Sequence, residues 1–234
     1  MPDPTDDAHG PAVDAGPAGP ATGRARRGPY GKTSGRARLV ASTAHDLVVR
    51  GGHRALTLAE VARRADLTEA QVLYLFPSRD HLLIAALEHA DTLSGERYRA
   101  THAGAALEPD LALAQAVRES LSDPAVLRLF VAMTAEAADP EHPAHTWAAR
   151  HQRRAARAYA QMLIDLQHQG WAHPDVDPAQ FGRQLVALWD GLQTQWLVDP
   201  AFDLGTEVGA GLRTLARHDA VLARAAVERL ATRL

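Results

Sequence analysis

The segment that most constrains the fold runs from Thr57 to Arg79, TLAEVARRADLTEAQVLYLFPSR. Apolar residues recur in it at helical spacing, are interrupted at Asp66 and Leu67, and resume after Thr68. Thr57 and Thr68 each open a capping-box pattern, in which a Thr hydroxyl and an acid or amide three residues later satisfy N–H groups of the first helical turn. The segment therefore predicts two short helices joined by a tight turn, an arrangement typical of a helix-turn-helix that places its second helix in the DNA major groove.

The distribution of charge agrees with a contact to DNA. Residues 24–81 contain eleven Lys or Arg and five Asp or Glu, which gives +6; because the whole chain carries −3, the remainder carries −9. A basic segment on an acidic body is suited to binding a polyphosphate. The alternative is that these arginines are solvated surface, which we place second because the basic excess coincides with the two-helix segment.

Residues 1–33 contain six Pro and six Gly and no periodic apolar pattern, which predicts a disordered arm. Its basic residues form a run without an intervening acid. Such a run is either a solvated tail or an arm that lies along phosphates or enters a minor groove. The residues of the run are Arg24, Arg26, Arg27 and Lys32.

The rest of the chain predicts an all-α protein. A first helix is expected from about Gly35 to Arg50, a long one from Arg79 to Arg99, and about six more beyond residue 90, separated by Pro and Gly. No segment alternates like a strand. The expected later helices are 110–121, 125–137, 143–169, 178–198, 205–217, and one from His218 or Asp219 to Arg233.

Other features narrow the class of protein. The chain has no cysteine, so no disulfide or thiolate metal site is expected. No signal-peptide pattern and no uncharged run of bilayer length is found, so we expect a cytoplasmic protein.

The order of motifs over residues 36–90 resembles the N-terminal domain of the TetR family of transcriptional regulators. The chain shows an amphipathic helix ending in Gly, then T-x-x-x-V-A-x-x-A, a turn, a short helix ending in Phe, and Pro-Ser-Arg-x-x-Leu-Leu. The resemblance implies an all-α homodimer that binds a palindromic double-stranded DNA operator and releases it when a small-molecule effector enters the C-terminal domain. It implies a helix-turn-helix domain over residues 34–81 and a ligand-binding and dimerisation domain over residues 82–234, without cofactor or membrane. Repression is the usual mode of the family.

The resemblance also suggests which side chains meet DNA. Gln71 can pair with adenine, Glu69 can accept from cytosine, and Ala70 can touch thymine, although Gln71 could instead be used in capping. Arg79 stands where the family usually has a Lys that binds phosphate. The expected DNA-binding residues are Arg36, Thr57, Thr68, Glu69, Ala70, Gln71, Tyr74, Ser78 and Arg79.

Three positions depart from the family pattern, of which Ala70, at the small residue early in the recognition helix, is a harmless change. Asp66 replaces the usual Gly of the turn, and Leu73 replaces a Tyr that family members present to the DNA backbone. Tyr74 follows one place later, but a helix turns about 100° per residue, so Tyr74 is not a simple replacement.

The body offers a candidate interface and a candidate pocket. The run LVALWDGLQTQWL within Gln180–Pro200 resembles the C-terminal domain of one group of TetR-type regulators, near the dimer interface and pocket. Its broad apolar face is either core or part of a four-helix dimer interface with the helix 205–217, whose small residues Gly205, Gly209, Ala210 and Gly211 would allow close approach. The expected interface residues are Leu185, Leu192, Trp196, Val208 and Leu212. The expected pocket residues, which an ordinary core could equally contain, are Phe130, Met133, Trp147, His151, Tyr159, Trp189 and Gln193.

Two other classes of function were weighed. Twelve histidines suggest a metal site, above all around His142, His145 and His151, but their spacing matches no known ligand set and we expect no metal. The sequence lacks a nucleophile elbow, H-E-x-x-H and a dinucleotide fingerprint, so we expect no enzyme. The alternatives kept are a helical interaction protein with a degenerate DNA-binding head and, further behind, an all-α enzyme.

Overall fold

A computed structural model of the chain describes residues 29–102 and 107–231. Within these ranges the chain is built from α-helices and one short 3-10 turn, without a strand, which confirms the all-α prediction. The helices are α1 Pro29–Gly51, α2 Leu58–Arg64, α3 Glu69–Leu75, α4 Arg79–His102, α5 Pro109–Ser120, α6 Pro124–Glu136, α7 Ala144–His168, α8 Pro178–Val198, α9 Leu204–Leu215 and α10 His218–Ala231. None of the described helices is both long and apolar enough to cross a membrane.

Helix α1 is longer than the sequence predicted. It begins at Pro29 rather than near Gly35, so residues 29–33 of the expected arm are helical, while residues 1–28 lie outside the described part of the chain. Proline is well suited to a first helical position, because it has no N–H to leave unpaired and its φ is already helical. The helix ends at Gly51, as expected, and Gly52 reverses the chain with a φ of +74°.

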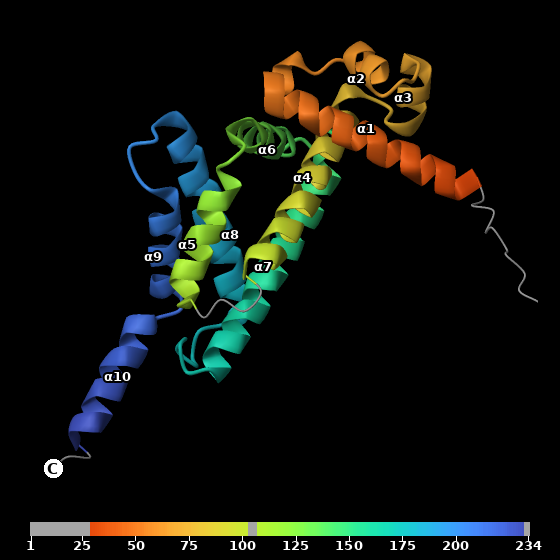
Figure 1. Cartoon of the computed structure of the whole chain (residues 1–234). Helices are drawn as coiled ribbons and strands as arrows, with labels where there is room; N and C mark the ends of the chain where they lie inside the picture. Colours follow the sequence, from red (N-terminus) through yellow and green to blue (C-terminus); the bar gives the residue numbers. More distant parts are fainter. Residues whose placement is uncertain (1–28, 103–106, 232–234) are drawn as a thin grey trace, which may run out of the picture.

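Helices α2 and α3 form the predicted two-helix unit, which lies at one end of the molecule with α1 (Figure 1). The complete capping box occurs only at α3, where the Thr68 hydroxyl accepts from Gln71 N (3.2 Å) and the Gln71 Oε1 accepts from Thr68 N (2.9 Å). At α2 the Thr57 hydroxyl accepts from Glu60 N (3.2 Å), but the Glu60 carboxylate pairs with Arg63 and Arg64 instead of reaching back. The first of the two predicted capping boxes is therefore only half formed.

Asp66 takes the left-handed conformation that the turn requires, with a φ of +53°. The N–H of Leu67 then donates to the carbonyl of Ala62 at 2.9 Å, which closes the end of α2 as a Schellman motif does. Aspartate adopts this conformation more readily than most residues other than glycine, so the turn forms despite the missing glycine.

Helices α1 to α3, which we call the head, share their hydrophobic core with the helices from α4 onward, which we call the body. Leu82, Leu83 and Leu87 of α4 are buried together with residues of α1 and α2, and the same cluster contains Leu129 of α6 and Trp147 of α7. The helices α4 and α7 run side by side from the head toward the far end of the molecule (Figure 1). A displacement of α4 or α6 would therefore disturb the packing of the head.

A second core lies among α5, α7, α8 and α9. Here helices approach closely enough to require glycine: a Cβ on Gly182 would stand 2.1 Å from the Ala156 carbonyl oxygen, and one on Gly205 would stand 2.4 Å from that of Ala114. Gly205 and Gly209 thus face α5 of the same chain, not a partner, which corrects that part of the interface prediction.

The same core corrects three of the expected interface residues. Leu185, Val208 and Leu212 have no exposed surface and pack inside this second cluster, so they offer nothing that a partner could touch. Of the expected set, only Leu192 and Trp196 are half-buried. The apolar pattern of α8 and α9 marked the core of the protomer, the alternative that the sequence had left open.

Helix α10 projects away from the body and makes its main contact with α9 (Figure 1). Its first residue, His218, is buried beneath the Trp171 ring, with ring centroids 4.1 Å apart, and its Nδ1 lies 2.7 Å from the Trp171 carbonyl oxygen.

Candidate DNA-binding face and ligand cavity

The outer surface of α3 presents the side chains expected to read bases. Glu69, Ala70 and Gln71 are exposed at its first turn, and Tyr74 one turn later is 84% exposed. Leu73, at the position of the family's usual Tyr, is 39% exposed. Tyr74, one position later than the family's tyrosine, is therefore still exposed and available to a partner.

Gln71 performs the capping role that competed with base reading. Its Oε1 accepts from the N–H of Thr68, which fixes the side chain along the start of α3. An adenine-specific bidentate contact uses both the amide oxygen and the amide nitrogen. The capping bond occupies one of the two lone pairs of the oxygen and fixes the direction of the amide, so Gln71 could make such a contact only in this orientation or by leaving its cap.

Two nitrogens of the Arg79 guanidinium are bonded within the protein. Its Nε donates to the Leu56 carbonyl oxygen at 2.9 Å and its Nη2 donates to the His53 carbonyl oxygen at 2.5 Å. These bonds tie the start of α4 to the linker before α2, because the Arg79 side chain folds back toward the head. Arg79 is thus a structural tie within the head, and its contact with phosphate stays a prediction.

The remaining expected DNA contacts divide between the cap positions and α1. The Ser78 hydroxyl lies 2.8 Å from His81 Nδ1, and the hydroxyls of Thr57 and Thr68 are used as caps. Arg36 is exposed and borders the same shallow hollow as Ala70, Gln71 and Tyr74. It is therefore the expected cation that lies beside the outer face of α3.

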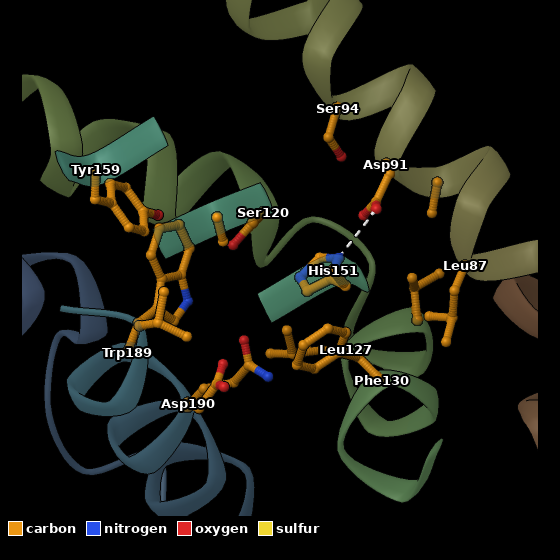
Figure 2. A pocket seen from close by; sticks show the side chains of 15 residues that line it. Leu87, Asp91, Ser94, Ser120, Leu127, Phe130, His151, Tyr159, Trp189 and Asp190 are labelled. Atoms are coloured by element: carbon orange, nitrogen blue, oxygen red, sulfur yellow. Dashed lines mark ion pairs between the residues drawn. The ribbon is translucent and has the colours of Figure 1, made fainter. Parts of the chain in front are cut away.

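A cavity of about 300 Å³ lies in the body, bordered by α4, α5, α6, α7 and α8. Figure 2 shows its lining, with Tyr159 and Trp189 on one side and Leu87 and Phe130 on the other. Of the seven expected pocket residues, it brings together Phe130, His151, Tyr159, Trp189 and Gln193.

The other two expected pocket residues lie elsewhere. Met133 and Trp147 are buried in the core that α6 and α7 share with the head, and do not border the cavity. Trp147 instead supports the wall from behind, since its ring lies 5.8 Å from Phe130 and 5.6 Å from His151, centroid to centroid. Trp147 and His151 lie on one face of α7, as their four-residue spacing predicted. Trp147 is buried in the core, however, while His151, one turn later, borders the cavity.

Polar side chains without a sequence signal of their own complete the lining. Asp91 of α4 accepts from Arg154 at 2.7 Å and lies 3.3 Å from His151 Nδ1. Asp190 of α8 lies next to Trp189, and burial raises its pKa above the usual value, opposed in part by the nearby His151. The sequence shows Asp190 within the aromatic run, but no local pattern indicates that α4 would bring Asp91 to the same cavity.

The three histidines considered for a metal site have other contacts. His142 Nε2 lies 3.5 Å from Asp80 Oδ2, His145 Nδ1 lies 2.9 Å from the Ala137 carbonyl oxygen, and His151 faces Asp91. Among the residues that the structure describes, no group of three potential ligands comes together.

Residues 41–86 match the sequence profile of the bacterial regulatory proteins of the tetR family. The helix-turn-helix head is a TetR-family domain. The match covers α2, α3 and parts of α1 and α4, which include the motifs on which the resemblance was based. A search of curated protein sequences finds no match.

Solved structures extend the likeness in fold to the rest of the chain. A protein from Rhodococcus sp. described as a TetR-family transcriptional regulator is 21% identical, with a TM-score of 0.62 over 78% of this chain and 99% of that one. One from Mesorhizobium loti, described likewise, is 16% identical, with a TM-score of 0.58 over 79% and 96%. FadR of Thermus thermophilus, a TetR-family repressor in complex with lauroyl-CoA, is 24% identical, with a TM-score of 0.57 over 77% and 92%. The chain therefore has the fold of the TetR-family transcriptional regulators, with the helix-turn-helix and the helical C-terminal domain that the sequence predicted.

Proposed function

We propose that this protein is a ligand-responsive transcriptional repressor, which binds a palindromic operator as a homodimer and leaves it when a small molecule fills the cavity. The proposal is supported by the TetR-type head, by the exposed outer face of α3, and by the cavity in the body. The lauroyl-CoA complex of the FadR structure is an example of a small molecule bound by this fold.

The observation that carries the proposal is the position of α4. This helix packs into the head through Leu82 and Leu83 and borders the cavity through Leu87, Asp91 and Ser94. A ligand that pushes on its cavity side must either move the helix or be excluded. Because the head is packed on the same helix, such a movement changes the separation of two heads in a dimer, and operator affinity falls.

The DNA contacts that we propose are those the structure leaves available. Tyr74 and Arg36 would meet the backbone, and Glu69 and Ala70 would lie nearest the base edges. Thr57, Thr68, Ser78 and Arg79 would act by shaping the head.

For the homodimer we propose the exposed face of α8 and α9. Small side chains lie on this face at helical spacing, among them Ala187 and Gly191 on α8 and Ala210 on α9, and a Cβ built on Gly191 meets no other atom within 4 Å. Two such faces related by a twofold axis can pack closely as a four-helix bundle.

A mobility-shift titration with DNA from upstream of the gene tests the repressor. We expect a shift that a palindromic competitor abolishes and that random duplex does not. Tyr74→Ala should weaken binding to the operator and to random duplex alike, by about 1 kcal/mol, because we propose a backbone contact for it. The melting temperature should not change, because the side chain is exposed. A shift removed by salt alone, with no preference among sequences, would leave only nonspecific binding and favour the alternative of a degenerate head.

A further inference from the structure

Resting on the proposed ligand-responsive function, we propose that the cavity takes a compact organic monocation that also carries a hydrogen-bond acceptor. Asp190 would serve as its counter-ion and Gln193 as its hydrogen-bond donor. The proposal names the chemical class of the effector from the residues that line this cavity.

The first requirement of a cation site is a negative charge that the protein has not already neutralised. Asp91 does not meet it, since the Arg154 guanidinium lies 2.7 Å away and His151 lies 3.3 Å away. The Asp190 carboxylate makes no ion pair with any described residue; Arg183, two turns earlier on α8, borders only a neighbouring surface hollow with it. The nearby His151 lowers the pKa of Asp190, against the larger effect of burial.

The buried position of Asp190 also destabilises its ionised form. Burial raises its pKa, which means that the folded chain disfavours the carboxylate compared with water. A cation in the cavity would recover part of this free energy, whereas an anion would add repulsion. The cavity therefore selects by charge.

The second requirement concerns Gln193, one turn after Asp190 on α8. Its side chain is 96% buried, with 4% of its surface accessible, and its Nε2 has no hydrogen-bond partner in the described structure. An amide N–H left without an acceptor in an apolar cavity costs about 1–3 kcal/mol. Because Gln193 borders the cavity, an acceptor on the ligand is the group that would satisfy it.

Aromatic rings border the remaining space. The Tyr159 and Trp189 rings lie with centroids 6.4 Å apart, and Phe130 stands 5.1 Å from His151 (Figure 2). The face of an aromatic ring attracts a cation and tolerates the alkyl groups of an organic ammonium. The cavity volume of about 300 Å³ is at the small end of ligand sites, so the ligand is compact.

Isothermal titration calorimetry at about pH 8, where an ordinary histidine is neutral, tests the charge directly. The probes are acetylcholine, which combines an ammonium with an ester acceptor, and 3,3-dimethylbutyl acetate, its uncharged analogue of the same shape. We expect the wild-type chain to bind the cation at least about tenfold more tightly than the neutral analogue. Asp190→Asn keeps the shape of the side chain, and should reduce this ratio to within about twofold. Asp199→Asn removes an exposed acid just beyond α8 and should leave the ratio unchanged.

Gln193→Leu tests the donor, and should weaken both probes by a similar factor because both carry the ester. Equal affinity for the two probes, no binding of either at millimolar concentration, or a preference that survives Asp190→Asn would each overturn the proposal. Operator affinity is measured separately. A cation that binds through Asp190 without releasing DNA contradicts the proposed repressor mechanism, and a different ligand that releases DNA contradicts only the cation site.

Discussion

Arg79 holds the head together through its side chain. Because its guanidinium donates to the carbonyls of His53 and Leu56, Arg79→Ala should lower the free energy of unfolding by about 1–3 kcal/mol. Chemical denaturation measures this loss, with Arg50→Ala, at the exposed end of α1, as the control. The salt dependence of DNA binding should keep its slope. A flatter slope with unchanged stability would restore the phosphate role that the sequence suggested.

Asp190 predicts a pH dependence of stability. Its pKa is raised in the folded chain, so the folded state binds the proton more tightly, and stability falls as pH rises from the unfolded pKa through the folded one. Asp190→Asn removes the ionisable group, and with it this fall in stability. The variant should therefore gain stability over wild type at neutral pH, and the gain should shrink toward acid pH. Urea unfolding at several pH values measures it, and a variant that is less stable than wild type at neutral pH would contradict the account.

At the scale of elements, Asp203 joins α9 to α5. Its carboxylate caps α9 by accepting from Thr206 N at 2.7 Å and pairs with Arg118 Nε at 2.9 Å, and these hydrogen bonds hold its pKa at about 2. The ion pair is solvent-exposed, so Asp203→Asn, which keeps a capping side chain, should cost at most about 1 kcal/mol at neutral pH. Asp203→Ala should cost about 1 kcal/mol more, because the cap is lost as well.

The pH profile separates the two contributions of Asp203. The stabilisation from a lowered pKa is present above the unfolded value and is lost as pH falls toward 2, so the gap between wild type and Asp203→Asn should close over that range. A gap that stays constant down to pH 2 would show that the ion pair contributes nothing. Thermal unfolding followed by circular dichroism measures it.

Elements were predictable where their signals are local. The Thr68 cap, the prolines that start α6 and α8, and the Gly51–Gly52 stop are all visible in the sequence and all appear in the structure. What the apolar face of a helix packs against could not be predicted in this way. The apolar residues of α8 and α9 would look the same whether they met a partner or the second core, and only the tertiary structure places Leu185 and Gly205 inside the protomer.

The cavity residues, too, were predictable only where the signal lies within one helix. Residues that share a helix with other pocket residues, such as His151 and Trp189, could be predicted from spacing. Asp91 could not, because its place in the cavity depends on how α4 packs alongside α7. The structural role of Arg79 could not be predicted either, because its partners, the carbonyls of His53 and Leu56, carry no sequence signal.

At the scale of the whole molecule, the proposed interface predicts that one substitution on the exposed face of α8 dissociates the dimer. Gly191→Arg places a long charged side chain where the protomer leaves open space, so the protomer should fold normally while the dimer dissociates. Sedimentation velocity measures the mass, and Ala135→Arg, at an exposed position near the end of α6, is the control. A Gly191→Arg protein that stays dimeric would place the interface on another face.

The central claim is that a symmetric pair of these heads recognises a specific palindrome. Selection of fragments from the source genome by the purified protein, at physiological ionic strength, tests it most directly. The account predicts that the bound fragments share an inverted repeat whose half-sites are about one DNA turn, roughly 34 Å, or a multiple of it apart. Retention of all fragments in proportion to their abundance, with no shared repeat, would contradict it.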